Sequence, residues 1–199
     1  MTSTNESLRE RRRRQTLQEI HEVALRLVRE RGFDRVTVEA ISAEAGVSPR
    51  TFFNYFPTKE AAVIEGPPLL PDDVLAAFIA AGPAHPRELL ADLTDLMVRY
   101  TAEHPPPYDV LATFQLAHDH PAILAVLLAG FDEYQRHLAT AVAARTGEQP
   151  SDEMPRLIAA LAVAAVKTGL DSVTARGGND DPIPYVRSAV AALHNLLGR

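Results

Sequence analysis

Apolar residues recur at helical spacing along most of this chain. The stripe from Leu17 to Val28 repeats about every 3.6 residues, which predicts an amphipathic helix. Gly32 is placed to end that helix, because helices commonly close on a glycine. No stretch of useful length alternates between apolar and polar positions, as a half-buried strand would. We therefore expect an all-α protein with about nine helices.

Two short helices joined by a turn are predicted between Thr37 and Phe56. Thr37 and Ser48 are suited to be N-caps, whose hydroxyls accept hydrogen bonds from first-turn amides. Gly46 stands where the chain must turn, and Pro49 occupies the first position of the second helix. Helix, glycine turn and helix is the arrangement of the helix-turn-helix motif. Together with the long helix before it, this predicts an N-terminal three-helix head, followed by a larger C-terminal helical bundle domain.

The second short helix has faces of different chemistry. Phe52 and Phe56 are four residues apart, so they share one side and can bury against the first short helix. The residues that fall largely on other sides are Arg50, Thr51, Asn54 and Tyr55. Arginine can donate two hydrogen bonds to guanine, and asparagine can both donate to and accept from adenine. Because the second helix of this motif enters the DNA major groove, we expect the polar side chains to read bases.

Motif residues keep a single register from Gly32 to Glu60. They are Gly32–Phe33, Val36–Thr37–Val38, Ala45–Gly46–Val47–Ser48, Thr51–Phe52–Phe53, Tyr55–Phe56 and Lys59–Glu60. This run covers roughly a quarter of the 199-residue chain and resembles the DNA-binding domain of the tetracycline-repressor (TetR) family. Arg50 stands where that family often has a small residue, and Phe53 stands where it commonly has a tyrosine. The residues expected to contact DNA are Thr37, Ser48, Pro49, Arg50, Thr51, Phe53, Asn54, Tyr55 and Lys59.

The net charge of −6 is unevenly divided along the chain. Residues 1–60 hold 11 Lys and Arg against 9 Asp and Glu, so +2, which leaves 9 against 17 in the remainder, so −8. A local basic patch can bind a polyanion even on an acidic protein. Arg9 and Arg11 to Arg14 precede the long helix, so we expect this arm to contact phosphates or the minor groove, with a solvated arm as the alternative.

We expect a domain boundary near residue 60, with a DNA-binding domain at 1–60 and a ligand-binding and dimerisation domain at 61–199. Thr58 and Lys59 open the next helix, whose N-terminal end would favour the DNA backbone. Gly66–Pro67–Pro68 then interrupts the chain before a helix beginning near Asp72. Any signal between the two domains would pass through this interrupted segment.

The last two predicted helices carry apolar and small residues on most sides. In the last helix, Val186, Val190, Leu193 and Leu197 step by four, three and four residues. Small residues in the helix before it allow close approach. One interpretation is that both helices fill the core of a single domain. The other, which the resemblance to the family implies, is a four-helix bundle shared between two subunits of a homodimer.

Aromatic and polar residues at mid-chain indicate a candidate cavity for a small molecule. The residues expected to line it are Phe78, Met97, Tyr100, Phe114, His118, Phe131 and Tyr134. At helical spacing such residues also suit an ordinary core. A metal site at His118–Asp119–His120 is not favoured, because residues two apart do not share a helix face. The chain lacks a Gly-x-Ser-x-Gly elbow and a glycine-rich phosphate loop, so neither catalysis nor a cofactor is predicted.

The predicted function is that of a ligand-responsive transcriptional regulator, expected to be a repressor. It would bind a palindromic DNA operator as a homodimer and be released by a small, largely apolar effector. The N-terminus is polar and lacks an apolar segment, so we expect a cytoplasmic protein without contact to a membrane. The alternatives are a constitutive DNA-binding dimer without an effector, and an enzyme whose N-terminal helices merely dock a partner.

Overall fold

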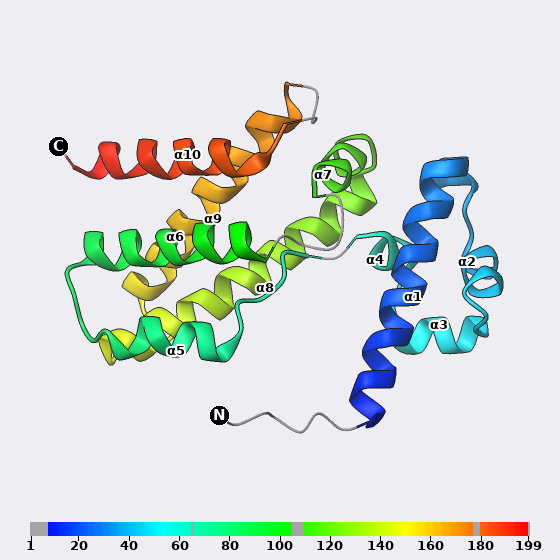
Figure 1. Cartoon of the computed structure of the whole chain (residues 1–199), viewed down its shortest axis with the longest axis horizontal. Coiled ribbons are helices and arrows are strands. Elements are labelled where there is room, and N and C mark those ends of the chain that lie inside the picture. Colours follow the sequence, from blue (N-terminus) through cyan, green and yellow to red (C-terminus); the bar gives the residue numbers. More distant parts are fainter. Residues whose placement is uncertain (1–7, 65, 105–109, 177–179, 199) are drawn as a thin grey trace. The chain divides into compact units, whose positions relative to one another are not determined.

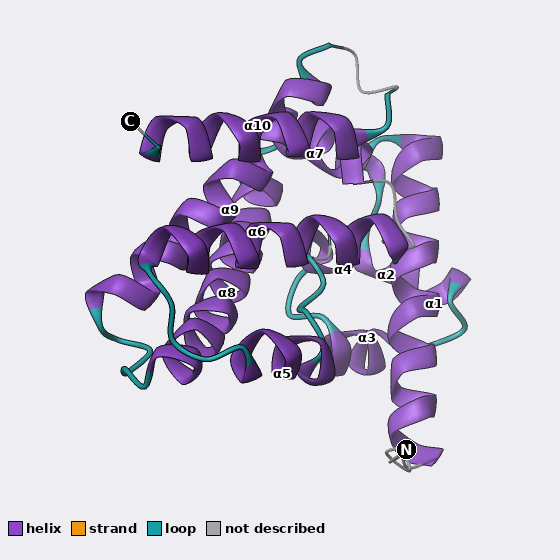
Figure 2. Cartoon of the chain, turned by 60° about the vertical axis from the view of Figure 1, so that its left-hand side comes forward, coloured by secondary structure: helices purple, strands orange, loops and turns teal. Residues whose placement is uncertain are grey.

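The computed structural model describes residues 8–64, 66–104, 110–176 and 180–198. Within these ranges the chain is helical and contains no strand, which confirms the all-α prediction (Figures 1 and 2). The helices are α1 (Leu8–Arg31), α2 (Val38–Glu44), α3 (Pro49–Tyr55), α4 (Lys59–Val63), α5 (Asp72–Ala80), α6 (Pro86–Glu103), α7 (Val110–Asp119), α8 (Pro121–Thr146), α9 (Glu153–Thr174) and α10 (Pro182–Leu197), with a short 3-10 helix at Phe33–Arg35.

Several helix boundaries differ from the expected ones. Helix α1 begins at Leu8, so the basic run lies on the helix instead of forming an arm ahead of it. Helix α10 begins at Pro182, because the carboxylate of Asp181 caps it by accepting from the amide of Ile183 at 3.0 Å. By sequence, Pro105–Pro106–Pro107 would also stop a helix and Gly177–Gly178 would begin a turn, but these residues lie outside the described ones.

The chain divides into two compact units, Met1–Glu65 and Gly66–Arg199. The first unit extends past residue 60, where we expected the boundary, because α4 packs against α1. The Nδ1 atom of His21 donates to the carbonyl oxygen of Ala62 at 2.8 Å, and Ala62 is fully buried. Helix α4 therefore belongs to the compact body of the first unit.

The first unit has a small apolar core beneath its short helices. Ile20 and Leu27 of α1, Ile41 of α2 and Phe52 of α3 are all 0 % exposed. Gly46, with φ of 69°, lies in the left-handed region and makes the turn between α2 and α3 without the strain of a side chain. This core holds α3 by one side and leaves its other sides free.

The second unit is built around α9, which contacts α6, α7, α8 and α10. Helices α9 and α10 approach closely at Gly169, where an added Cβ would lie 2.5 Å from the Cα of Val186. A second close approach joins Gly66, at the start of this unit, to Gly130 of α8.

Among the described helices, α9 is long and apolar enough to cross a membrane by length and composition, but 44 % of its apolar window is buried by other helices.

Candidate nucleic-acid interface and ligand-binding region

Helix α3 is anchored by aromatic residues on one side. Phe52 is 0 % exposed and Phe56, which follows the helix, is 6 % exposed, with their ring centroids 5.9 Å apart. The ring of Phe53 meets that of Phe52 edge-on but is itself 55 % exposed. The buried pair fixes the rotation of α3 about its axis, so the remaining side chains have a defined outward direction.

The outward side of α3 carries Arg50 and Asn54, four residues apart and both exposed. In the described part of the chain, neither side chain has a hydrogen-bond or ion-pair partner. A free guanidinium and a free carboxamide together offer the donors and acceptor that distinguish guanine and adenine in the major groove. Pro49 is also exposed, whereas Thr51 and Tyr55 are half-buried.

The hydroxyl groups predicted to contact DNA also cap helices. The Oγ of Ser48 accepts from the amide of Thr51 at 3.0 Å and lies 2.8 Å from the Oγ1 of Thr51. The Oγ1 of Thr37 accepts from the amide of Ala40 at 3.2 Å. The hydroxyls of Thr37 and Ser48 therefore cap α2 and α3, and the hydroxyl of Thr51 bonds to the Ser48 cap.

Lys59 does not extend freely toward a DNA backbone, contrary to the sequence expectation. Its Nζ donates to the carbonyl oxygens of Phe33, at 3.0 Å, and Val36, at 2.9 Å. The same ammonium lies 3.9 Å from the centroid of the Phe33 ring. The lysine therefore ties the start of α4 to the segment that leads into α2, a tertiary contact that its sequence neighbours did not reveal.

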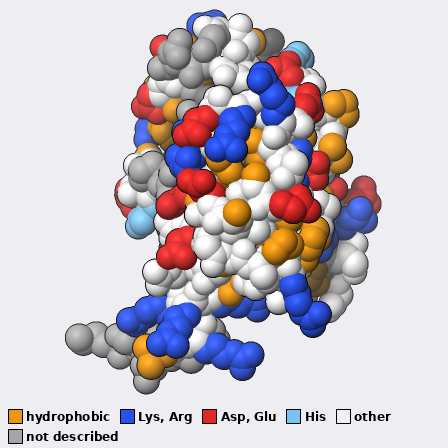
Figure 3. Space-filling view, turned by 90° about the vertical axis from the view of Figure 1, so that its right-hand side faces the viewer, with side chains coloured by type: hydrophobic (Ala, Val, Ile, Leu, Met, Phe, Trp, Pro, Cys, Tyr) orange, Lys and Arg blue, Asp and Glu red, His pale blue; other side chains and the backbone are white. Residues whose placement is uncertain are grey.

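The start of α1 is strongly basic. Arg9, Arg11, Arg12 and Arg13 are all exposed. Figure 3 shows Lys and Arg side chains gathered at the lower end of the view, where α1 begins, whereas charges of both signs mix over the rest of it. These arginines form a surface suited to phosphate contacts.

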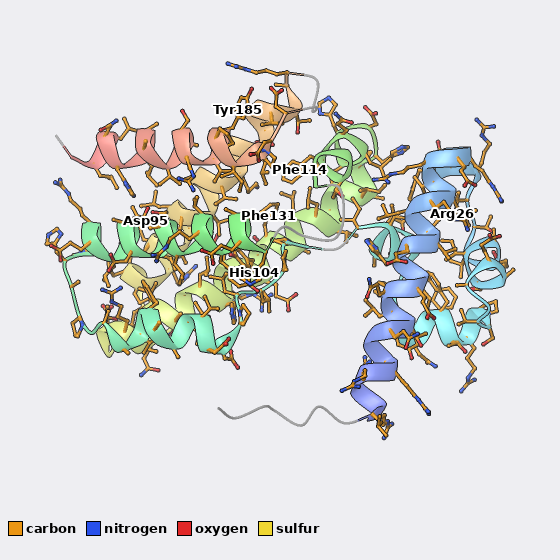
Figure 4. All side chains as sticks on the ribbon, in the orientation of Figure 1. Arg26, Asp95, His104, Phe114, Phe131 and Tyr185 are labelled. Carbon is orange, nitrogen blue, oxygen red and sulfur yellow. The ribbon has the colours of Figure 1, made fainter. Side chains whose placement is uncertain are left out.

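The predicted ligand-binding residues are only partly brought together. Phe114 of α7 and Phe131 of α8 meet edge-on with ring centroids 5.9 Å apart. Figure 4 labels both residues. Tyr134 lies one turn further along α8 and is 6 % exposed. Burial, with a smaller effect of nearby Tyr100 of α6, raises the pKa of the Tyr134 phenol well above its ordinary value. We refer to Phe114, Phe131 and Tyr134, with Tyr100 of α6 close to Tyr134, as the aromatic cluster.

His118 and Phe78 differ in their surroundings from this cluster. His118 is exposed near the end of α7. Phe78 of α5 is buried beneath the guanidinium of Arg145, whose Cζ lies 4.5 Å from the ring centroid. Met97 of α6 is 3 % exposed and belongs to the apolar core. Tyr100 also stacks on His104, which Figure 4 labels, with ring centroids 4.5 Å apart.

Sequence reasoning named one wall residue, Phe78, of a cavity of about 760 Å³ lined by α5, α6, α8 and α10, but did not predict the cavity itself. Its most unusual wall residue is Arg145, a buried arginine near the end of α8. Arg145 pairs with Asp92 of α6, and because the two residues are 53 positions apart, the pair leaves no local signal in the sequence. Only the presence of an arginine in the alanine-rich last turns of α8 could have drawn attention to it.

Comparisons with known proteins agree with these features. The family model for bacterial regulatory proteins of the tetR family matches residues 20–65, and the model for the MftR C-terminal domain matches residues 88–198. The HTH-type transcriptional regulator TcmR of Streptomyces glaucescens is 30% identical over 167 residues, which cover 80% of this chain and 74% of TcmR. An uncharacterized HTH-type transcriptional regulator of Mycobacterium bovis, Mb1581, is 29% identical over 124 residues, but this match spans only 57% of that protein.

Solved structures of bacterial regulators align with this chain at low sequence identity. The fatty acid degradation regulator FadR from Bacillus halodurans aligns with a TM-score of 0.47 and 14% identity, over 90% of this chain and 94% of that one. A putative TetR-family regulator from Mesorhizobium loti aligns with a TM-score of 0.48 and 19% identity, over 94% and 97% of the two chains. The C-terminal family model alone spans more than half of the sequence. Together with the match to TcmR, it shows that this chain belongs to the TetR family of bacterial transcriptional regulators.

Proposed function

We propose that the protein is a ligand-responsive repressor that binds a palindromic operator as a homodimer and leaves it when a small, largely apolar effector binds. The observation that carries this proposal is the two-sided character of α3, where Phe52 is fully buried while Arg50 and Asn54 are exposed without partners among the described residues. A short helix held in this way suits insertion into a major groove. The first compact unit would bind DNA, and the second would bind the effector and the partner subunit.

The proposed dimer forms through α9 and α10. Leu157 of α9 is 47 % exposed and Leu196 of α10 is 78 % exposed, which is unusual for leucines on the helices of a packed bundle. Ala164 and Thr168, at helical spacing from Leu157, are exposed as well and would let a second pair of helices approach closely. A two-fold dimer presents two copies of α3, and its operator would therefore contain two inverted half-sites.

The proposed effector site is the aromatic cluster of α6, α7 and α8. Phe114, Phe131 and Tyr134 offer large apolar surfaces, and the phenol of Tyr134 adds a polar group, a combination typical of small-molecule sites. The segment between α4 and α5 would transmit the effect by changing the distance between the two DNA-binding units of the dimer. This mode of action is that of a cytoplasmic protein, since its DNA target lies there.

The test uses DNA selected from a random library by the full-length protein. Replacing Arg50 or Asn54 with Ala should weaken binding to the selected operator by about 1–3 kcal/mol for each base that the side chain no longer reads. Fluorescence anisotropy measures the affinity, and circular dichroism checks that each variant is folded. The control is Arg31→Ala, which removes an exposed arginine at the end of α1.

If Arg31→Ala and Arg50→Ala weaken binding equally, α3 does not read the sequence. If the selected DNA contains no inverted repeat, the proposed dimeric mode of binding is wrong. A small molecule that stabilises the protein yet leaves operator affinity unchanged would favour a constitutive DNA-binding dimer.

A further inference from the structure

The cavity between α5, α6, α8 and α10 is large enough for a small organic molecule. Its volume of about 760 Å³ lies within the usual range of ligand pockets. Phe78, Val98 and Val190 supply apolar wall, and alanines of α5 and α10 leave the space open. None of the rings in the aromatic cluster of α6, α7 and α8 lines this cavity, so the two sites are separate.

One wall of the cavity holds a buried cation whose hydrogen bonding is incomplete. The Nε of Arg145 donates to the carbonyl oxygen of Gly82 and its Nη2 donates to the Oδ2 of Asp92, each at 2.7 Å. The side chain is only 4 % exposed, and its Nη1 has no hydrogen-bond partner among the residues that the structure describes. The guanidinium lies over the ring of Phe78, with its Cζ 4.5 Å from the ring centroid. A buried donor without an acceptor is costly, so a ligand that brings an acceptor to this guanidinium is favoured.

Further cations line the same cavity. Arg99 of α6 and Arg187 of α10 are exposed, and neither is paired within the described ranges. The lining holds two aspartates, and Asp92 is paired with Arg145, so only Asp95 of α6, labelled in Figure 4, has a charge left to offset. The positive charges of Arg99 and Arg187 exceed this one negative charge, so the lining carries a net positive charge.

We infer that this cavity binds a small organic carboxylic acid with an apolar body. The carboxylate of the ligand accepts hydrogen bonds from the guanidinium groups, with Arg145 as the buried anchor. Charge-assisted bonds to carboxylates suit the planar donors of arginine. The apolar body lies against Phe78, Val98 and Val190. The cavity does not compete with the proposed dimer for the same side of α10. Leu196 of the dimer surface follows His194 of the cavity wall by two residues, so the two side chains lie about 200° apart around the helix.

The experiment compares three fragments that share a benzyl group and differ in charge: phenylacetate, phenylacetamide and phenethylamine. Each is titrated into the full-length protein by calorimetry, with a thermal-shift assay in parallel. Phenylacetate should bind at least about tenfold more tightly than phenylacetamide, and phenethylamine should bind more weakly still. Equal or tighter binding of the amine would overturn the inference, because the aspartates would then dominate.

Matched variants locate the site. Ala77→Leu narrows the cavity from α5, leaves Arg145 unchanged in the sequence, and should abolish binding of phenylacetate. Ala76→Leu changes an exposed neighbour outside the lining and should preserve binding. Arg145→Lys keeps the charge but removes the planar donors, so the preference for the acid over the amide should shrink about tenfold. Unchanged binding to Ala77→Leu contradicts the inference. The inference is also contradicted if neither phenylacetate nor cyclohexylacetate, which replaces the phenyl ring with a cyclohexyl ring, binds to the wild-type protein.

Discussion

Phe52 and Phe53 are neighbours on α3 with opposite surroundings, since Phe52 is 0 % exposed and Phe53 is 55 % exposed. Phe52→Ala should lower the free energy of unfolding of the first unit by about 3–5 kcal/mol, because removing a buried aromatic ring leaves a cavity. Phe53→Ala should cost much less, although it removes one edge-on ring pair. Urea denaturation followed by circular dichroism measures both. A larger loss of stability for Phe53→Ala would reverse the assignment of the two sides of α3.

At the residue scale, local chemistry was predictable and distant contacts were not. Thr37 and Ser48 were expected to be N-caps, and both accept the expected amide hydrogen bonds, because capping depends on residues three positions away. Lys59 and Arg145 were not understood from sequence, because their partners lie 23 or more residues distant. Whether the exposed side chains of α3 touch bases stays a prediction.

At the scale of elements, the basic start of α1 is expected to make the affinity for DNA depend on salt concentration. Replacing the four exposed arginines of this turn with Gln should weaken binding to all DNA sequences alike, because phosphate contacts release counterions without reading bases. The slope of log K against log salt should fall by about 0.9 for each phosphate that is no longer neutralised. The four are Arg9, Arg11, Arg12 and Arg13.

A matched control removes the same charge from the second unit. The exposed arginines for it are Arg87, Arg136, Arg156 and Arg176. This control should leave the salt slope unchanged. If both sets of substitutions reduce the slope equally, the start of α1 acts only through net charge.

The packing of α9 against α10 depends on one residue without a side chain. Gly169→Ala would put a Cβ 2.5 Å from the Cα of Val186, so backbone must move. Ala improves helix propensity by about 1 kcal/mol, but the overpacking costs about 1–3 kcal/mol, so we expect stability to fall or stay unchanged. Thermal unfolding of Gly169→Ala against Thr140→Ala, an exposed residue of α8 outside the proposed dimer helices, measures the effect. A clear rise in the melting temperature of Gly169→Ala would show that the two helices separate easily.

Helix existence was more predictable than helix ends. The break between α4 and α5 followed from Gly66–Pro67–Pro68, since proline cannot continue a helix. The early start of α1 at Leu8 was missed, because an arginine run carries no apolar periodicity although arginine is a good helix former. The cavity was missed for a different reason, since it needs four helices to meet and no single segment encodes it.

At the scale of the whole molecule, two compact units divide the chain near residue 65, and the family to which it belongs regulates transcription. The proposed homodimer through α9 and α10 links the stability of the second unit to the geometry of DNA binding. A dimer must place its two recognition helices about one DNA turn apart, roughly 34–36 Å, or a multiple of that distance. The spacing of half-sites is therefore the property that separates dimeric operator recognition from binding by independent subunits.

The most direct measurement titrates the full-length protein against the selected operator and against the same operator with about five base pairs, half a helical turn, inserted between its half-sites. Fluorescence anisotropy at fixed salt gives both affinities. We expect the insertion to reduce affinity to that of a single half-site, because the second copy of α3 then faces the wrong side of the DNA. Equal affinity for the two DNAs would contradict recognition of a palindromic operator by a homodimer.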